Sequence, residues 1–204
     1  LLARLADKPW QRPFFVEFSG TPKSGKSTCI DITQHFLRRV GFKVLAPTEG
    51  ASKRTPYFLK EDWEAFNAWS ACYALTHVLE GLYGSDKYDV AILDRGVFDA
   101  LVWFELLASD GTISAEHRDT VQKFLLLPKW REPIDTVFLF RSSPEVALRR
   151  ETSDKLITDP GRAMNEETLT KLNEAYEAVR DKFSTQFRDF TFTLGATGFF
   201  GEES

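Results

Sequence analysis

The sequence has 204 residues, of which 43% are hydrophobic and 27% are charged, so it holds enough apolar material for the core of one ordinary domain. Its formal net charge of −4 argues against a basic face for nucleic acid or for an anionic membrane, and we expect neither partner. No apolar run approaches the ~18 residues that span a bilayer, and the charges within Leu1 to Pro13 exclude a signal peptide.

The two cysteines indicate the compartment. Cys29 and Cys72 are too few for a disulfide framework, and neither belongs to a C-x-x-C pair or lies beside a histidine that could share a metal. Both occur in apolar helical patterns. We therefore expect two core thiols in a soluble protein of the reducing cytoplasm.

The first predicted element is a short apolar strand from Phe14 to Phe18, which leads into a phosphate-binding loop. Residues Gly20 to Ser27 match G-x-x-x-x-G-K-[ST]. Glycines allow the backbone to curl so that its N–H groups point at an anion, and the helix that follows adds its own unpaired N–H groups. We predict that ATP binds at Gly20, Thr21, Pro22, Lys23, Ser24, Gly25, Lys26, Ser27 and Thr28.

A helix from Ser27 to Val40 is predicted next, and Gly41 stands where a left-handed residue ends a helix. The short strand Phe42 to Leu45 follows. A strand–helix–strand unit of this kind requires a parallel sheet. We place the apolar side chains of this helix on one stripe: Ile30, Ile32, Phe36, Leu37 and Val40.

The helix predicted from Glu61 to Leu82 carries two apolar stripes, so two of its faces are expected to be buried. The first stripe is assigned to the core: Ala68, Ala71, Cys72, Leu75, Leu79 and Leu82. The second is aromatic, and it is open to three interpretations, namely core, a partner surface or a wall for a planar ligand: Trp63, Phe66, Trp69 and Tyr73.

A buried strand from Tyr88 to Leu93 ends in Asp94 and Arg95. In P-loop enzymes a carboxylate at this point holds Mg²⁺ together with the Ser or Thr of the loop, which is Ser27 here. An aspartate at this point could also simply cap a turn. ATP-driven motors usually place a glutamate after this aspartate to activate water. Arg95 is instead a cation that could hold an acceptor, unless it is only a surface ion-pair partner. The Asp94-Arg95 pair therefore favours transfer of a phosphoryl group to an acceptor over hydrolysis. GTPases recognise guanine with an Asn/Thr-Lys-x-Asp segment, and the absence of this segment argues against a GTPase.

The rest of the chain continues the alternation of helices and strands. The predicted elements are helices Val97 to Ser109 and Ser114 to Leu126, strand Asp135 to Arg141, a helix that begins at Ser143, helix Glu166 to Phe187 and strand Phe190 to Leu194. Between the last two helices, residues 149–163 lack periodicity. We expect a mobile basic lid there that carries Arg149, Arg150 and Arg162.

The P-loop, the Asp94-Arg95 pair and the basic segment together resemble the thymidylate kinase and deoxynucleoside kinase superfamily. This resemblance implies ATP, Mg²⁺ and a small-molecule acceptor, and helix-mediated homodimers are common among such proteins. Glu49 then corresponds to the general base of deoxynucleoside kinases, and Thr48 stands where thymidylate kinases have an arginine. Phe66 and Asn67 correspond to the Phe-Gln pair that contacts the acceptor base, and Trp63 is a further candidate for that wall.

We therefore expect one α/β domain over residues 1–204 with a P-loop NTPase fold, in which residues 1–13 form an N-terminal extension. Its parallel sheet should have five strands with helices on both faces. The expected activity is transfer of the ATP γ-phosphate to a nucleoside or a nucleoside monophosphate. The catalytic candidates are Lys26, Glu49, Asp94, Arg95, Arg149, Arg150 and Arg162.

Two alternatives stay open at this point. The first is a P-loop kinase for a small molecule that is not a nucleotide. The second is a nucleotide-binding regulatory domain with vestigial hydrolysis, whose aromatic stripe docks a partner.

Overall fold

A computed structural model of the chain describes residues 12–46, 54–153, 162–187 and 190–195, and these form a five-stranded sheet in the order β2-β3-β1-β4-β5. Each pair of neighbouring strands is parallel, as predicted. The strands are β1 (Phe14–Gly20), β2 (Val44–Leu45), β3 (Val90–Asp94), β4 (Ile134–Arg141) and β5 (Phe190–Gly195).

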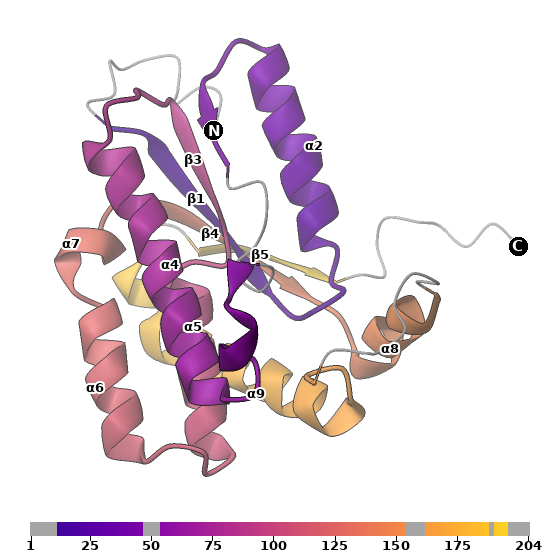
Figure 1. The fold of residues 1–204 in the computed structure, drawn as a ribbon. Coiled ribbons are helices and arrows are strands. Elements are labelled where there is room, and N and C mark those ends of the chain that lie inside the picture. Colours follow the sequence, from indigo (N-terminus) through magenta and orange to yellow (C-terminus); the bar gives the residue numbers. More distant parts are fainter. Residues whose placement is uncertain (1–11, 47–53, 154–161, 188–189, 196–204) are drawn as a thin grey trace, which may run out of the picture.

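Helices cover both faces of the sheet, and this confirms the predicted α/β architecture (Figure 1). The α-helices of the described residues are α2 (Lys26–Arg39), α4 (Trp63–Tyr83), α5 (Val97–Ser109), α6 (Ala115–Leu125), α7 (Pro128–Arg131), α8 (Pro144–Ser153) and α9 (Glu166–Phe183). The short α7 and two 3₁₀ turns, Tyr57–Leu59 and Ser184–Gln186, were not predicted, since so few residues carry no periodicity. None of the helices described is long and apolar enough to cross a membrane.

Alternation along β1 divides the core between the two faces of the sheet. Phe14, Val16 and Phe18 pack on one face with Ile30 and Leu37 of α2. Phe15 packs on the opposite face with Val78 of α4. The larger core on the same side as α4 also contains buried apolar residues of α5 and α9. Because β1 is the central strand and is packed on both faces, the position of the loop at its carboxyl end is fixed.

The apolar stripe predicted for α2 is only partly buried. Ile30 and Leu37 are buried, but Ile32, Phe36 and Val40 have exposed fractions of 64%, 48% and 50%. A helix that lies on one face of a sheet buries the residues along its line of contact. No described element covers the outer side of α2, so the rest of the stripe faces outward.

The buried face of α4 is rotated from the predicted one. Ala68 and Cys72 are exposed and Leu79 is 38% exposed, so the prediction of a core thiol is wrong for Cys72, whereas Cys29 is half-buried. Small residues instead allow close packing, since a Cβ on Gly81 would lie 2.7 Å from the Phe15 ring. The residues buried on α4 are Asn67, Ala71, Ala74, Leu75, Val78 and Gly81.

We expect the two glycines of the phosphate-binding loop to differ in what they tolerate. A Cβ on Gly20 would lie 1.9 Å from the Phe140 carbonyl oxygen, whereas a Cβ on Gly25 meets nothing within 4 Å. Gly20→Ala must push β1 away from β4 and should cost about 3 kcal/mol of unfolding free energy. Gly25→Ala should cost only the ~1–2 kcal/mol of a left-handed residue. Urea unfolding without nucleotide measures both, and equal losses would contradict this account.

Candidate functional site

The loop between β1 and α2 is shaped to receive an anion. Gly20, Lys23 and Gly25 all have positive φ values, 144°, 56° and 95°, so the chain curls repeatedly within a few residues. The first turn of α2 has no side-chain cap and no acidic residue, which leaves its N–H groups available. The Ser24 hydroxyl is buried and has no hydrogen-bond partner among the described residues. A phosphate group fits these features.

Lys26 lies within this loop with its charge largely removed from water. Its exposed fraction is 7%, and Nζ donates to the Thr21 carbonyl oxygen at 3.4 Å. Burial, and then the positive charge of Arg95, lower the pKa of Lys26 to about 7. The bound phosphates would restore the charged form, so Lys26 is suited to recognise them.

This lowered pKa predicts that nucleotide binding takes up a proton. At about pH 8.5 Lys26 is mostly neutral in the free protein, and phosphates that raise its pKa should make binding take up close to one proton. Affinity should then fall by up to about tenfold per pH unit above pH 7. Calorimetry with AMP-PNP in buffers of different ionisation enthalpy measures the uptake. Lys26→Ala should abolish it, and equal uptake in the mutant would refute the assignment.

Asp94 and Arg95 lie at the same edge of the sheet as the loop. Asp94 is in register with Phe18 of β1, two residues before Gly20, and the Arg95 backbone N–H donates to the Phe18 carbonyl oxygen at 3.0 Å. Arg95 has a φ of 65°, which is unusual for a residue with a side chain. Although burial opposes its charge, the pKa of Arg95 is raised by the Asp99 carboxylate, which lies 2.8 Å from the guanidinium.

Glu17 fixes the turn that carries Arg95, and the sequence analysis did not single it out. This carboxylate is fully buried and accepts hydrogen bonds from Ser19 Oγ at 2.6 Å and from the N–H groups of Gly96, Phe98 and Asp99 at 2.9–3.1 Å. It therefore caps the start of α5. Burial, opposed by the Ser19 hydrogen bond, raises its pKa. A glutamate within an otherwise apolar strand was the available signal.

A pocket of about 430 Å³ opens beside the loop and Arg95. Its wall is formed by the predicted residues Trp63, Phe66, Asn67 and Arg95 together with Trp103, which was not predicted to belong to the site. The structure thus brings the acceptor-site candidates of α4 next to the Asp94-Arg95 turn. The remaining lining residues are Pro22, Lys60, Ser70, Ala71, Gly96, Asp99, Ala100, Arg162, Ala163 and Met164.

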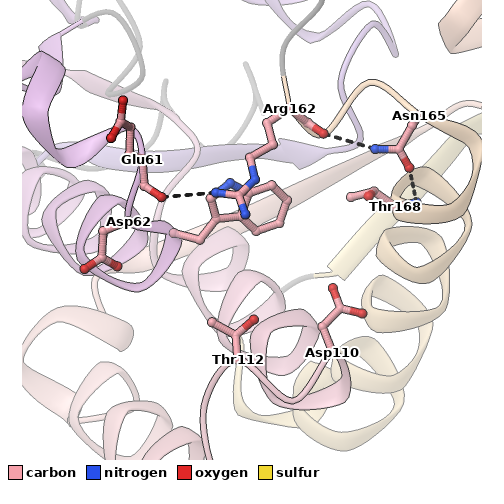
Figure 2. A pocket seen from close by; sticks show the side chains of 8 residues that line it. Glu61, Asp62, Asp110, Thr112, Arg162, Asn165 and Thr168 are labelled. Carbon is pink, nitrogen blue, oxygen red and sulfur yellow. Dashed lines mark hydrogen bonds between the residues drawn. The ribbon is translucent and has the colours of Figure 1, made fainter.

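Arg162 and Trp63 line both this pocket and a second, wider pocket of about 600 Å³. Figure 2 shows Arg162 reaching from the segment before α9 to the start of α4, where it donates to the Glu61 carbonyl oxygen at 3.1 Å. Its guanidinium lies 4.8 Å from the centre of the Trp63 ring. Two of the three acids of the wider pocket are engaged elsewhere, since Asp62 caps α4 and Asp110 pairs with Lys171.

Two residues of helix α8 contact Lys23 of the phosphate-binding loop. Arg150 donates to the Lys23 carbonyl oxygen at 2.8 Å, and Lys23 Nζ lies 2.8 Å from Glu151 Oε2. Arg149 is exposed and lines neither described pocket. Of the three lid arginines predicted to act in catalysis, the structure brings Arg150 and Arg162 to the site and leaves Arg149 outside it.

Ser27 and Asp94 are suitable donors for Mg²⁺. Both offer the hard oxygen atoms that this ion prefers, and they lie in the first turn of α2 and at the carboxyl end of β3. Within the described residues no group of three or more His, Cys, Asp and Glu side chains could hold a metal. An ion bound by one or two side chains and by nucleotide phosphates needs no such group.

Several predictions fall on residues that the structure does not describe. Thr48 and Glu49, and residues 154–161 of the predicted lid, lie outside the described ranges, as do residues 1–11 of the predicted extension. Of the aromatic stripe, Trp63 and Phe66 line the smaller pocket. Trp69 stacks on Tyr73 at 5.2 Å between ring centres, and neither ring lines a described pocket.

The fold and the loop have the form seen in P-loop proteins. No family model and no curated protein matches the sequence. Among solved structures, deoxyadenosine kinase from M. mycoides with bound dCTP is similar at a TM-score of 0.60 and 20% identity, over 90% of both chains. The same kinase with products dCMP and dCDP bound gives a TM-score of 0.62 at 17% identity, over 90% of this chain and 91% of that one. The chain shares the fold of these P-loop deoxynucleoside kinases.

Proposed function

We propose that this protein is an ATP-dependent phosphotransferase that moves the γ-phosphate to a (deoxy)nucleoside or a nucleoside monophosphate. One observation carries the proposal: the 430 Å³ pocket is bordered by Pro22 of the loop, by Arg95 and by the rings of Trp63, Phe66 and Trp103. Flat aromatic walls suit a base, and a cation beside the loop suits the reacting end of an acceptor. The shared fold with kinases that hold dCTP or dCMP supports this choice.

In this proposal the residues act mainly by position and charge. An acceptor oxygen attacks the γ-phosphorus, the bond between that phosphorus and the β–γ bridging oxygen breaks, and ADP leaves with the electron pair. Lys26 and Arg95 offset the negative charge on the oxygens during transfer. Mg²⁺ held by Ser27 and Asp94 would neutralise the β- and γ-phosphate oxygens. A hydroxyl acceptor gives its proton to Glu49, whereas a monophosphate acceptor is already ionised and needs no base.

Acceptor dependence tests this function. ATP and Mg²⁺ are incubated with the protein and with single nucleosides or nucleoside monophosphates, and ADP release is followed. A kinase should release ADP much faster when its acceptor is present. Acceptor-independent release would favour a nucleotide-binding regulatory domain.

A further inference from the structure

Asp99 uses its whole carboxylate to join separate parts of the site. It lies in the first turn of α5 and is 2% exposed. One oxygen accepts from the Tyr176 hydroxyl and from the Gly20 N–H at 3.2 Å. The other accepts from Arg95 at 2.8 Å and from the Trp103 ring N–H at 3.0 Å. A carboxylate offers about four acceptor positions, so these four donors occupy it fully.

The two carboxylate oxygens of Asp99 bind residues from two different parts of the site. The first holds Gly20, which begins the phosphate-binding loop, and the Tyr176 hydroxyl also accepts from the Gly20 N–H at 3.0 Å. The second holds Arg95 and Trp103, both of which line the acceptor pocket. A single buried group thus connects the donor loop to two walls of the acceptor pocket.

The geometry points to Asp99 as a positioning residue that couples the two ligands, so that bound ATP tightens acceptor binding and acceptor tightens ATP binding. This inference rests on the proposed function. A buried carboxylate with every acceptor position filled cannot turn toward one partner without weakening its bonds to the others. Nucleotide that orders Gly20 therefore also orders Asp99, and through it Arg95 and Trp103. The coupling is reciprocal by thermodynamic necessity.

Two variants separate this role from a structural one. Asp99→Asn keeps the shape of the side chain but replaces one oxygen by a donor, which must then face another donor. Tyr176→Phe removes only the hydroxyl on the loop side, at a residue that lines neither described pocket. The matched control is Glu105→Gln on the same helix, whose carboxylate binds Arg118 and Gln122 away from both pockets.

Calorimetry tests the coupling with deoxyadenosine and dCMP as acceptor probes, each titrated with and without saturating AMP-PNP and Mg²⁺. We expect AMP-PNP to tighten binding of at least one probe by about fivefold or more in the wild type, a typical size for coupled sites. The ratio of the acceptor Kd without AMP-PNP to the acceptor Kd with AMP-PNP should fall to near one in Asp99→Asn. It should fall partly in Tyr176→Phe and stay unchanged in Glu105→Gln. Tyr176→Phe keeps the test valid if Asp99→Asn does not fold.

The failures can be told apart. The coupling is overturned, while the proposed function stands, if the wild-type ratio of Kd values is near one. The same holds if folded Asp99→Asn or Tyr176→Phe keeps the wild-type ratio. Binding of neither probe, together with no phosphate transfer to any nucleoside or nucleoside monophosphate, overturns the proposed function and the coupling with it.

Discussion

Replacing Lys26 by alanine should lower phosphoryl transfer by at least about 10²–10³-fold while the protein stays folded. Lys26 points into the phosphate-binding loop and its partner is the Thr21 carbonyl oxygen, so its removal takes away charge that the reaction needs. The loss should appear in kcat as well as in ATP affinity, because negative charge is concentrated on the γ-phosphate oxygens during transfer. Steady-state kinetics and circular dichroism of the same preparation measure both effects.

The control for this variant is Lys43→Ala, which removes an exposed lysine that lines neither described pocket. It should behave like the wild type. Transfer at the wild-type rate in Lys26→Ala would refute the assignment of the loop as the donor site.

Glu49→Gln should lower kcat by about 10²–10⁴-fold with little change in ATP affinity, if the acceptor presents a hydroxyl group. The amide keeps the shape of the side chain but cannot take the proton that leaves as the oxygen–phosphorus bond forms. The exposed Glu116 provides the matched control as Glu116→Gln. Kinetics with each acceptor separate kcat from KM.

The opposite result has a definite meaning. If Glu49→Gln keeps its kcat and only raises KM for the acceptor, Glu49 positions the acceptor and takes no proton. This result would favour a nucleoside monophosphate as the acceptor, and the hypothesis of a general base would be wrong.

The predicted fold rested on local patterns that the structure reproduces. The apolar run before Gly20 became β1, and the helix start predicted at Ser114 is capped by the Ser114 hydroxyl. The mistakes came from assigning burial by hydrophobicity alone. Cys72 and Ile32 fit apolar stripes, yet both are exposed, because burial depends on which side of a helix another element covers.

The candidate site was predictable only where its residues form a contiguous motif. Gly20 to Ser27 and the Asp94-Arg95 pair could be recognised from spacing. A lone glutamate in an apolar strand was a signal for Glu17, but the roles of Glu17 and Asp99 could not be predicted, because their carboxylates accept from residues as many as 82 and 79 positions away along the chain. Tyr176 is a buried core residue, and its hydroxyl also accepts from the Gly20 N–H. Such bonds follow from the parallel sheet, which brings distant strand ends to one edge.

Transfer of labelled γ-phosphate from ATP to a panel of nucleosides and nucleoside monophosphates tests the central claim most directly. We expect that label appears on at least one member of the panel, that this acceptor accelerates ADP release, and that Lys26→Ala abolishes both effects. Label that reaches only water, at a rate that no acceptor changes, would contradict this claim.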